Sequence, residues 1–231
     1  MVRQADILSN YFARAANRAE KRNFTVRRCV FGSIADMSIK AVIFDLDGTI
    51  TQPYFDFDAI REEIGLAKDS GPILESMEKM TLRERRRAEE ILHRHEEKAV
   101  AESELNAGAR ETLSALRQAG IHVGVLTRNK RSNALAIARK HNLKFDAIVD
   151  REDGPVKPDS FGVLRLCSQF GVEPRDALVV GDYLFDLLCA KAAGAVAVLL
   201  ANHHQAGEFA EHADFCIENL SRILQIIKDS P

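Results

Sequence analysis

The feature that most constrains this chain is a short segment, residues 39–49, in which an apolar run ends in two closely spaced acids. Residues 41–44 (AVIF) are continuous and partly β-branched, which is typical of a central strand buried on both faces of a parallel sheet. Asp45 and Asp47 follow directly, and Gly48 lets the backbone turn away sharply. Because buried carboxylates are costly unless a cation or a substrate meets them, the segment predicts a functional site at the carboxyl end of this strand.

The second half of the chain alternates predicted helices and strands. Helical patterns cover residues 109–119, 133–141, 161–170, 187–193 and 220–227, and strand patterns cover residues 121–126, 145–149, 177–180, 195–200 and 215–217. Repeated strand–helix units form parallel sheets with right-handed crossovers. The expected fold class is therefore α/β, a Rossmann-like parallel sheet with helices on both faces.

A helical insertion separates the first strand from these repeats. Apolar residues at helical spacing precede Gly65, and Gly71-Pro72 opens a second helical segment. Thr81 stands where it can cap a third helix over residues 82–101, which is dense in charge. Such a charge run is typical of a solvated helix face.

Residues 1–36 differ in composition from the rest, with seven lysines and arginines against three acids. An arginine-rich, acid-poor amphipathic start is typical of an organellar transit peptide. Two alternatives stay open: a helical arm packed on the domain, or an upstream extension with the true start at Met37. We expect an intracellular soluble protein, cytoplasmic or, if the segment is a transit peptide, mitochondrial or plastid.

Charge and composition narrow the partners. A net charge of -2 argues against a nucleic acid or an anionic membrane as the main partner, and no apolar run approaches the ~18 residues of a membrane span. The scattered cysteines predict reduced thiols, of which the last three are expected in the core: Cys29, Cys167, Cys189 and Cys216. Four histidines lack zinc-site spacing and are expected at the surface: His93, His95, His203 and His204.

Three further polar stretches lie after predicted strands. Thr127 directly follows the run VGVL, Lys157 lies in the segment VKPD of the predicted loop, and residues 181–186 (GDYLFD) follow the run LVV. Taken in order with residues 45–49, these stretches resemble the four motifs of the haloacid dehalogenase-like (HAD) hydrolase superfamily. The resemblance covers about residues 39–218 and is nearest to phosphoglycolate phosphatase-like enzymes.

The resemblance implies the HAD fold with a small helical cap inserted after the first strand, at the C1 position. It divides the chain into a basic extension (1–36), a catalytic core (37–50 and 105–231) and a cap (51–104). Caps of this kind close over the site, exclude water and select the substrate.

The resemblance also assigns roles to the acids. Asp45 is the expected nucleophile, since a carboxylate can attack phosphorus and form an aspartyl-phosphate. Mg²⁺ is the expected cofactor, and its ligands would be Asp45, Asp47 through its backbone carbonyl, and Asp182, with support from Asp186. Asp47 is the expected general acid and base. Dehalogenases of the superfamily lack an acid at that place, so Asp47 points to phosphoryl transfer.

The remaining predicted site residues meet the phosphoryl group. Thr127 would offer a hydroxyl, and Lys157 would supply positive charge. Gly48, Arg128 and Asn129 are candidates for further phosphate contacts. Many relatives carry Asn directly after the motif-two Thr, whereas Arg128 stands there and Asn129 follows; Arg128 could face an anionic group of the substrate or solvent, and solvent is favoured.

The function expected from these residues is Mg²⁺-dependent hydrolysis of a small phosphomonoester, of the phosphoglycolate or sugar-phosphate type, through an aspartyl-phosphate. The expected partner is therefore a small phosphorylated metabolite. A phosphomutase or a nucleotide phosphotransferase would use the same motifs, and a non-catalytic interaction protein is the alternative from another class. The sequence leaves the oligomeric state and the individual substrate open.

Overall fold

The computed structural model describes residues 38–230, and within them six strands form one parallel sheet in the order β3-β2-β1-β4-β5-β6. The strands are β1 (Ala41–Phe44), β2 (His122–Leu126), β3 (Ala147–Val149), β4 (Ala177–Gly181), β5 (Val196–Leu200) and β6 (Phe215–Ile217). The parallel α/β fold predicted from the alternating pattern is confirmed.

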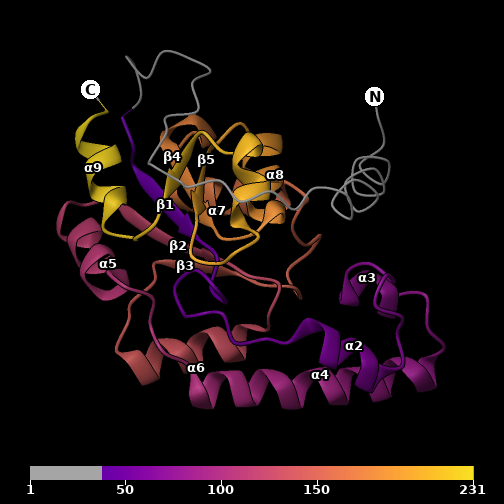
Figure 1. Cartoon of the computed structure of the whole chain (residues 1–231). Coiled ribbons are helices and arrows are strands. Elements are labelled where there is room, and N and C mark those ends of the chain that lie inside the picture. The colour runs from indigo at the N-terminus through magenta and orange to yellow at the C-terminus, as the bar shows by residue number, and fades with distance from the viewer. Residues whose placement is uncertain (1–37, 231) are drawn as a thin grey trace.

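Helices cover both faces of this sheet (Figure 1). One face packs against α5 (Ala109–Gln118), α6 (Arg131–His141) and α9 (Arg222–Lys228). The other packs against α7 (Phe161–Phe170) and α8 (Leu184–Ala193). Short 3₁₀ helices, η1 (Pro174–Asp176) and η2 (Ala206–His212), precede β4 and β6.

Strand β1 shows why its sequence is apolar throughout. Val42 and Phe44 belong to the core beneath α5 and α9, whereas Ala41 and Ile43 belong to the core beneath α7 and α8. All four side chains are fully buried, because successive residues of a strand point to opposite faces. The strand lies at the centre of the sheet between β2 and β4, so its carboxyl end lies between theirs.

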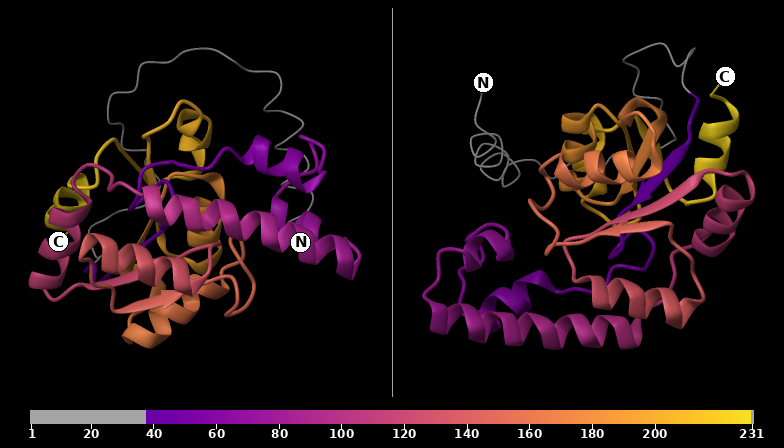
Figure 2. Two further views of the ribbon diagram at one scale, coloured as in Figure 1. Left: turned by 90° about the horizontal axis from the view of Figure 1, so that it is seen from below. Right: turned by 180° about the vertical axis from the view of Figure 1, so that it is seen from behind.

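The insertion after β1 contains three helices, α2 (Phe57–Ile64), α3 (Ile73–Met77) and α4 (Leu82–Glu102), which lie beyond the carboxyl ends of the strands (Figure 2). They share a small apolar cluster of their own, made of Ile60, Ile73, Met77, Ala88 and Leu92. The long helix α4 extends back beside α6 and joins the insertion to the core.

Thr81 caps α4 as predicted: its hydroxyl accepts a hydrogen bond from the Glu84 amide, and the Glu84 side chain accepts one from the Thr81 amide. The prediction for α8 is less accurate, because this helix begins at Leu184 rather than at residue 187. The Asp186 carboxylate accepts a hydrogen bond from the Tyr183 backbone amide, so an acid that the sequence predicts for the site also stabilises the first turn.

The last three cysteines are buried, as predicted. The predictions for residues 1–36, for a start at Met37 and for Cys29 lie outside the described residues. Within residues 38–230, no helix is both long enough and apolar enough to cross a membrane.

Candidate active site

The predicted site residues gather at one edge of the sheet because their strands run parallel and in register. Phe44 of β1 pairs with Val125 of β2 and with Val180 of β4. The residues that follow these strands therefore meet at the same edge, and the Asp45 amide donates to the Val180 carbonyl over 2.8 Å.

Lys157 reaches this edge from the loop between β3 and α7, and its ammonium lies between two acids. Its Nζ is 2.6 Å from Asp45 Oδ1 and 2.6 Å from Asp186 Oδ1, and only 4% of the side chain is exposed. Burial lowers the pKa of Lys157, but the Asp186 and Asp45 carboxylates outweigh it and hold the pKa above its ordinary value. The side chain is therefore a permanent, fixed positive charge.

Three carboxylates, Asp45, Asp182 and Asp186, lie close enough to bind one cation. Each offers an oxygen, and these oxygens all lie within 4.8 Å of one another. Burial, together with the neighbouring Asp45 and Asp186 charges, raises the pKa of Asp182 well above its usual range. Burial also raises the pKa of Asp186 to about 6, although Lys157 opposes the shift. Repelling buried carboxylates with hard oxygen donors fit a divalent cation such as Mg²⁺.

Two glycines allow this close approach. Gly48 has φ +91°, and a Cβ placed on it would lie 2.4 Å from Asp182 Oδ2. A Cβ on Gly181 would lie 2.1 Å from the Asp186 Cγ. The Thr49 hydroxyl then fixes Asp182 by donating to its Oδ1 over 2.8 Å. The crowding around the acids explains why both motifs contain glycine.

Asp47 lies beside the acid cluster in a different environment. Burial raises its pKa to about 7, the Asp45 charge adds to the rise, and a hydrogen bond from Asn129 opposes it. The side-chain Nδ2 of Asn129 donates to Asp47 Oδ2 over 3.1 Å, and the backbone N–H of Asn129 donates to Thr127 Oγ1 over 3.0 Å. A carboxyl group with a pKa near neutrality can both give and take a proton.

A cavity of about 740 Å³ opens from these residues toward the inserted helices. Asp45, Asp47, Thr127, Asn129 and Lys157 line its inner end. Apolar and aromatic side chains line much of the remainder: Pro53, Tyr54, Phe55, Phe57, Ile73, Leu74, Leu92, Tyr183 and Phe185. The site thus combines a charged end with a largely apolar wall.

Arg128 lines the cavity, so the preference for a solvent-facing side chain is wrong. Its Nη2 lies 2.7 and 2.9 Å from the two Glu75 carboxylate oxygens of α3, and its guanidinium lies 5.1 Å from the centre of the Phe185 ring. It also donates to the Lys157 carbonyl. Sequence reasoning did not foresee this ion pair with an acid on α3, which holds Arg128 at the cavity wall.

The surface expectation also fails for His203, whose side chain is only 20% exposed. Its Nε2 donates to the Asp182 carbonyl over 2.8 Å, so it supports a candidate metal ligand. His95 is partly buried and pairs with Glu63, whereas His93 and His204 are exposed, as expected.

Two asparagines that sequence reasoning missed hold the loop after β1. Asn106 Nδ2 contacts the carbonyls of Gly48, Thr49 and Thr51 at 2.8–2.9 Å, and Asn202 Nδ2 donates to the Gly48 carbonyl over 2.7 Å. Both residues are isolated in sequence, and no local pattern marks them.

Comparison with known proteins agrees with this geometry. The family model of haloacid dehalogenase-like hydrolases matches residues 39–194, which include the four motif regions. The chain belongs to this family. The resemblance predicted from the motifs is thereby confirmed, and so is its consequence that the chain is a hydrolase.

Several relatives in sequence are hydrolases, and some of them are named as phosphatases. An uncharacterized hydrolase of Saccharomyces cerevisiae is 33% identical over 201 residues, covering 83% of this chain and 92% of the relative. A phosphoglycolate phosphatase of Nitrosospira multiformis is 31% identical, covering 68% of this chain and 81% of the relative. An N-acetylmuramic acid 6-phosphate phosphatase of Pseudomonas aeruginosa is 29% identical, with 68% and 80% coverage.

Solved structures share the fold. A hydrolase from Pseudomonas syringae superposes with a TM-score of 0.71 at 21% identity, over 83% of this chain and all of the other. A β-phosphoglucomutase from Clostridium difficile superposes with a TM-score of 0.66 at 20% identity, over 83% and 96% of the two chains. At this level of identity, these likenesses establish the HAD fold alone.

Proposed function

We propose that this hydrolase is a Mg²⁺-dependent phosphatase that cleaves a small phosphomonoester through an aspartyl-phosphate. The observation that carries the proposal is the cluster of Asp45, Asp182 and Asp186 around Lys157, with Asp47 beside it. This constellation has a nucleophile, a fixed positive charge, a set of hard oxygen ligands and an acid of near-neutral pKa in one cavity.

Mg²⁺ would be held by Asp45, Asp182, Asp186 and the backbone carbonyl of Asp47. When bound, it supplies positive charge that reduces the repulsion between the carboxylate nucleophile and the phosphoryl group. Lys157 adds a second positive charge beside Asp45, and it needs no reorganisation during the reaction because both of its acid partners are already in place.

Asp45 and Asp47 divide the chemistry between them. A carboxylate oxygen of Asp45 attacks phosphorus, and the bond from phosphorus to the alcohol oxygen breaks as Asp47 gives that oxygen a proton. Asp47 then takes a proton from water as the water oxygen attacks the aspartyl-phosphate. Phosphate leaves, Asp45 is restored, and Asp47 is again protonated.

Other residues orient the phosphoryl group. Thr127 and Asn129 line the cavity, where their side chains would offer donors to phosphoryl oxygens, and the Gly48 backbone is a further candidate donor. Because Arg128 is paired with Glu75, we assign it to the cavity wall, where it joins α3 to the core, rather than to the phosphate.

The substrate is a small metabolite, since residues 51–104 would act as a cap over the core (37–50 and 105–231) and enclose it. Relatives named for phosphoglycolate and N-acetylmuramic acid 6-phosphate support this class. The cavity of about 740 Å³ and its apolar wall accommodate an alcohol portion larger than glycolate.

The test is phosphate release from p-nitrophenyl phosphate and a panel of small phosphate esters, with Mg²⁺ or with a chelator. We expect wild-type release that requires Mg²⁺ and falls to background in Asp45→Asn. Asp176→Asn is the matched control, because Asp176 pairs with Lys40 at the opposite edge of the sheet and should leave release unchanged.

Absence of release by folded, Mg²⁺-supplied wild type would overturn the phosphatase proposal. Conversion of a sugar phosphate to an isomer, with no free phosphate, would assign the same site to a mutase.

A further inference from the structure

Glu96 is a buried acid on the inserted helix α4. Its side chain is 3% exposed, and it lies on the same helix face as the buried residues Ala88, Leu92 and Ala99. Arg151, from the loop after β3, forms a two-pronged ion pair with it, using Nη1 for Oε1 and Nη2 for Oε2. An acid in an apolar stripe is costly to bury without a partner, and the Arg151 guanidinium supplies that partner and holds the carboxylate in a defined orientation.

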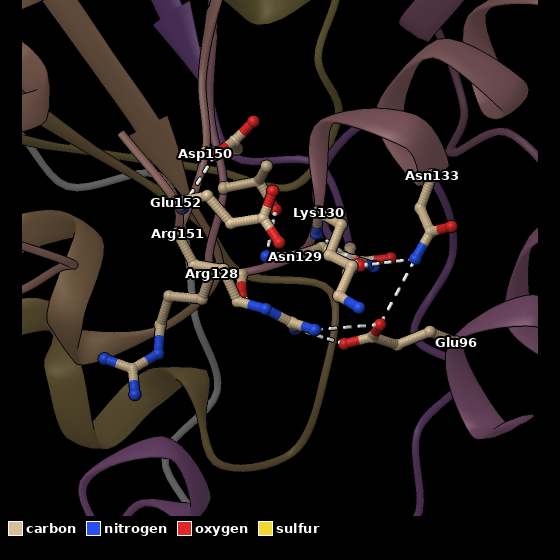
Figure 3. A network of polar contacts seen from close by, with 10 residues as sticks. Glu96, Arg128, Asn129, Lys130, Asn133, Asp150, Arg151 and Glu152 are labelled. Carbon is tan, nitrogen blue, oxygen red and sulfur yellow. Dashed lines mark hydrogen bonds and ion pairs between the residues drawn. The ribbon is translucent and has the colours of Figure 1, made fainter. Parts of the chain in front are cut away.

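Asn133 of α6 connects this acid to the active site (Figure 3). Its Nδ2 donates to Glu96 Oε2 over 3.2 Å and to Asn129 Oδ1 over 2.8 Å, and so uses both of its hydrogens. Asn133 is 6% exposed, and water has little access to this link.

Hydrogen bonds determine the orientation of the Asn129 side-chain amide. Its Oδ1 accepts from Asn133 Nδ2 and from the backbone N–H of Lys130, the latter over 2.8 Å. With two donors on its oxygen, the amide must turn its nitrogen toward Asp47 Oδ2, which lies 3.1 Å away. The hydrogen bond from Asn129 occupies Asp47 Oδ2 and leaves Asp47 Oδ1 for the reacting oxygen.

We propose that Glu96 and Asn133 are positioning residues that act through Asn129 to orient the Asp47 carboxyl group toward the leaving oxygen. The proposal rests on the phosphatase function above and adds a specific role for the inserted helix. Helix α4 supplies the acid that sets the orientation of the proton donor, in addition to a wall of the cavity.

A purely structural role, in which the contacts only attach α4 to α6, makes a different prediction. Lys140 provides such an attachment from the same helix α6: its Nζ donates to the carbonyls of Ala101 and Ser103 over 2.6 and 2.9 Å. These bonds end on backbone carbonyls at the C-terminal end of α4 and involve neither Asn129 nor Asp47. Lys140→Met therefore loosens the attachment of α4 without disturbing the proton donor, and it is the matched control.

The experiment compares two substrates in the intact enzyme with Mg²⁺. An alkyl phosphate needs a proton on its departing oxygen, whereas nitrophenolate leaves from p-nitrophenyl phosphate without one. We expect Asn133→Ala to lower kcat/KM for the alkyl ester at least about tenfold more than for the nitrophenyl ester, part of the factor that general acid catalysis supplies. Lys140→Met should change both substrates by the same factor.

A second pair of variants tests the same proposal if circular dichroism shows that Asn133→Ala does not fold. Glu96→Ala removes the acceptor for Asn133, whereas Glu96→Gln retains an acceptor oxygen of the same reach. We expect Glu96→Ala to reproduce the selective loss on the alkyl ester and Glu96→Gln to restore most of it.

Equal losses on both esters in the folded Asn133 and Glu96 variants would overturn the positioning role and leave the phosphatase proposal intact. A selective loss in Lys140→Met would do the same. A wild type that releases phosphate from neither ester would overturn the phosphatase proposal, and the positioning role with it.

Discussion

At the scale of single residues, the site depends on how closely carboxylates approach glycine and lysine. The sequence placed Asp45, Asp47 and Asp182 correctly at strand ends, because an apolar run followed by an acid is a local pattern. It could not foresee the contact between Lys157 and Asp186, which are 29 positions apart. It also could not foresee Asn106 and Asn202, whose roles arise only when the loop after β1 folds against them.

Gly48→Ala tests the crowding around Asp182. Gly48 and Gly65 have nearly identical φ values, +91° and +90°, so alanine should suffer a similar backbone strain of about 1–2 kcal/mol at either position. Only at Gly48 does the added Cβ meet a neighbour, Asp182 Oδ2 at 2.4 Å. We expect Gly48→Ala to abolish Mg²⁺-dependent phosphate release and Gly65→Ala to retain it despite a similar loss of stability. Comparable activity in the two variants would contradict this account.

At the scale of elements, the inserted helix α4 combines predictable and unpredictable features. Its N-terminus could be predicted, because Thr81 and Glu84 form a local capping box. The contacts of α4 with the core could not be predicted, because Glu96 belongs to a charge-dense sequence that is typical of a solvated face. Its partner Arg151 is 55 positions away, beyond any local pattern.

Thr81→Ala tests the capping box. Loss of the hydroxyl leaves the Glu84 amide without its acceptor, and we expect the first turn of α4 to lose about 1 kcal/mol. Hydrogen exchange at the first-turn amides should accelerate about fivefold, as that free energy implies. Ser160→Ala is the control, since Ser160 precedes α7 without a side-chain capping bond and should change exchange little. Equal acceleration in both helices would refute the role of Thr81.

At the scale of the whole molecule, the fold brings three like charges together at one edge of the sheet, because Asp45 and Asp182 directly follow β1 and β4 and Asp186 lies in the first turn of α8. The parallel α/β class followed from the alternating pattern, because parallel strands need a crossover connection and a helix between two strands provides it. The strand order β3-β2-β1-β4-β5-β6 required the structure, since the local patterns do not say which strands are neighbours.

Mg²⁺ should therefore stabilise the entire fold as well as the reaction. Asp45, Asp182 and Asp186 repel one another around a single ammonium, and a bound cation relieves that repulsion. We expect Mg²⁺ at 100 times the wild-type Kd to raise the free energy of unfolding of the wild type by about 2.7 kcal/mol, measured by denaturant titration. At the same Mg²⁺ concentration, Asp182→Asn should reduce this increment because it weakens binding, and Asp214→Asn, on the loop before β6, should keep it. An increment unchanged in Asp182→Asn would exclude Asp182 as a ligand.

Helix α4 carries Leu92 and Glu96 one turn apart, and both line the cavity. A lineage that adapts this wall to a new alcohol must change side chains beside the acid that orients the proton donor. Substrate preference and turnover are then coupled, and mutations that broaden the substrate preference will tend to lower the turnover rate. Compensating changes are expected at the partners of Glu96: at Asn133, which is buried behind the cavity wall, and at Arg151, which lines the cavity beside Glu96.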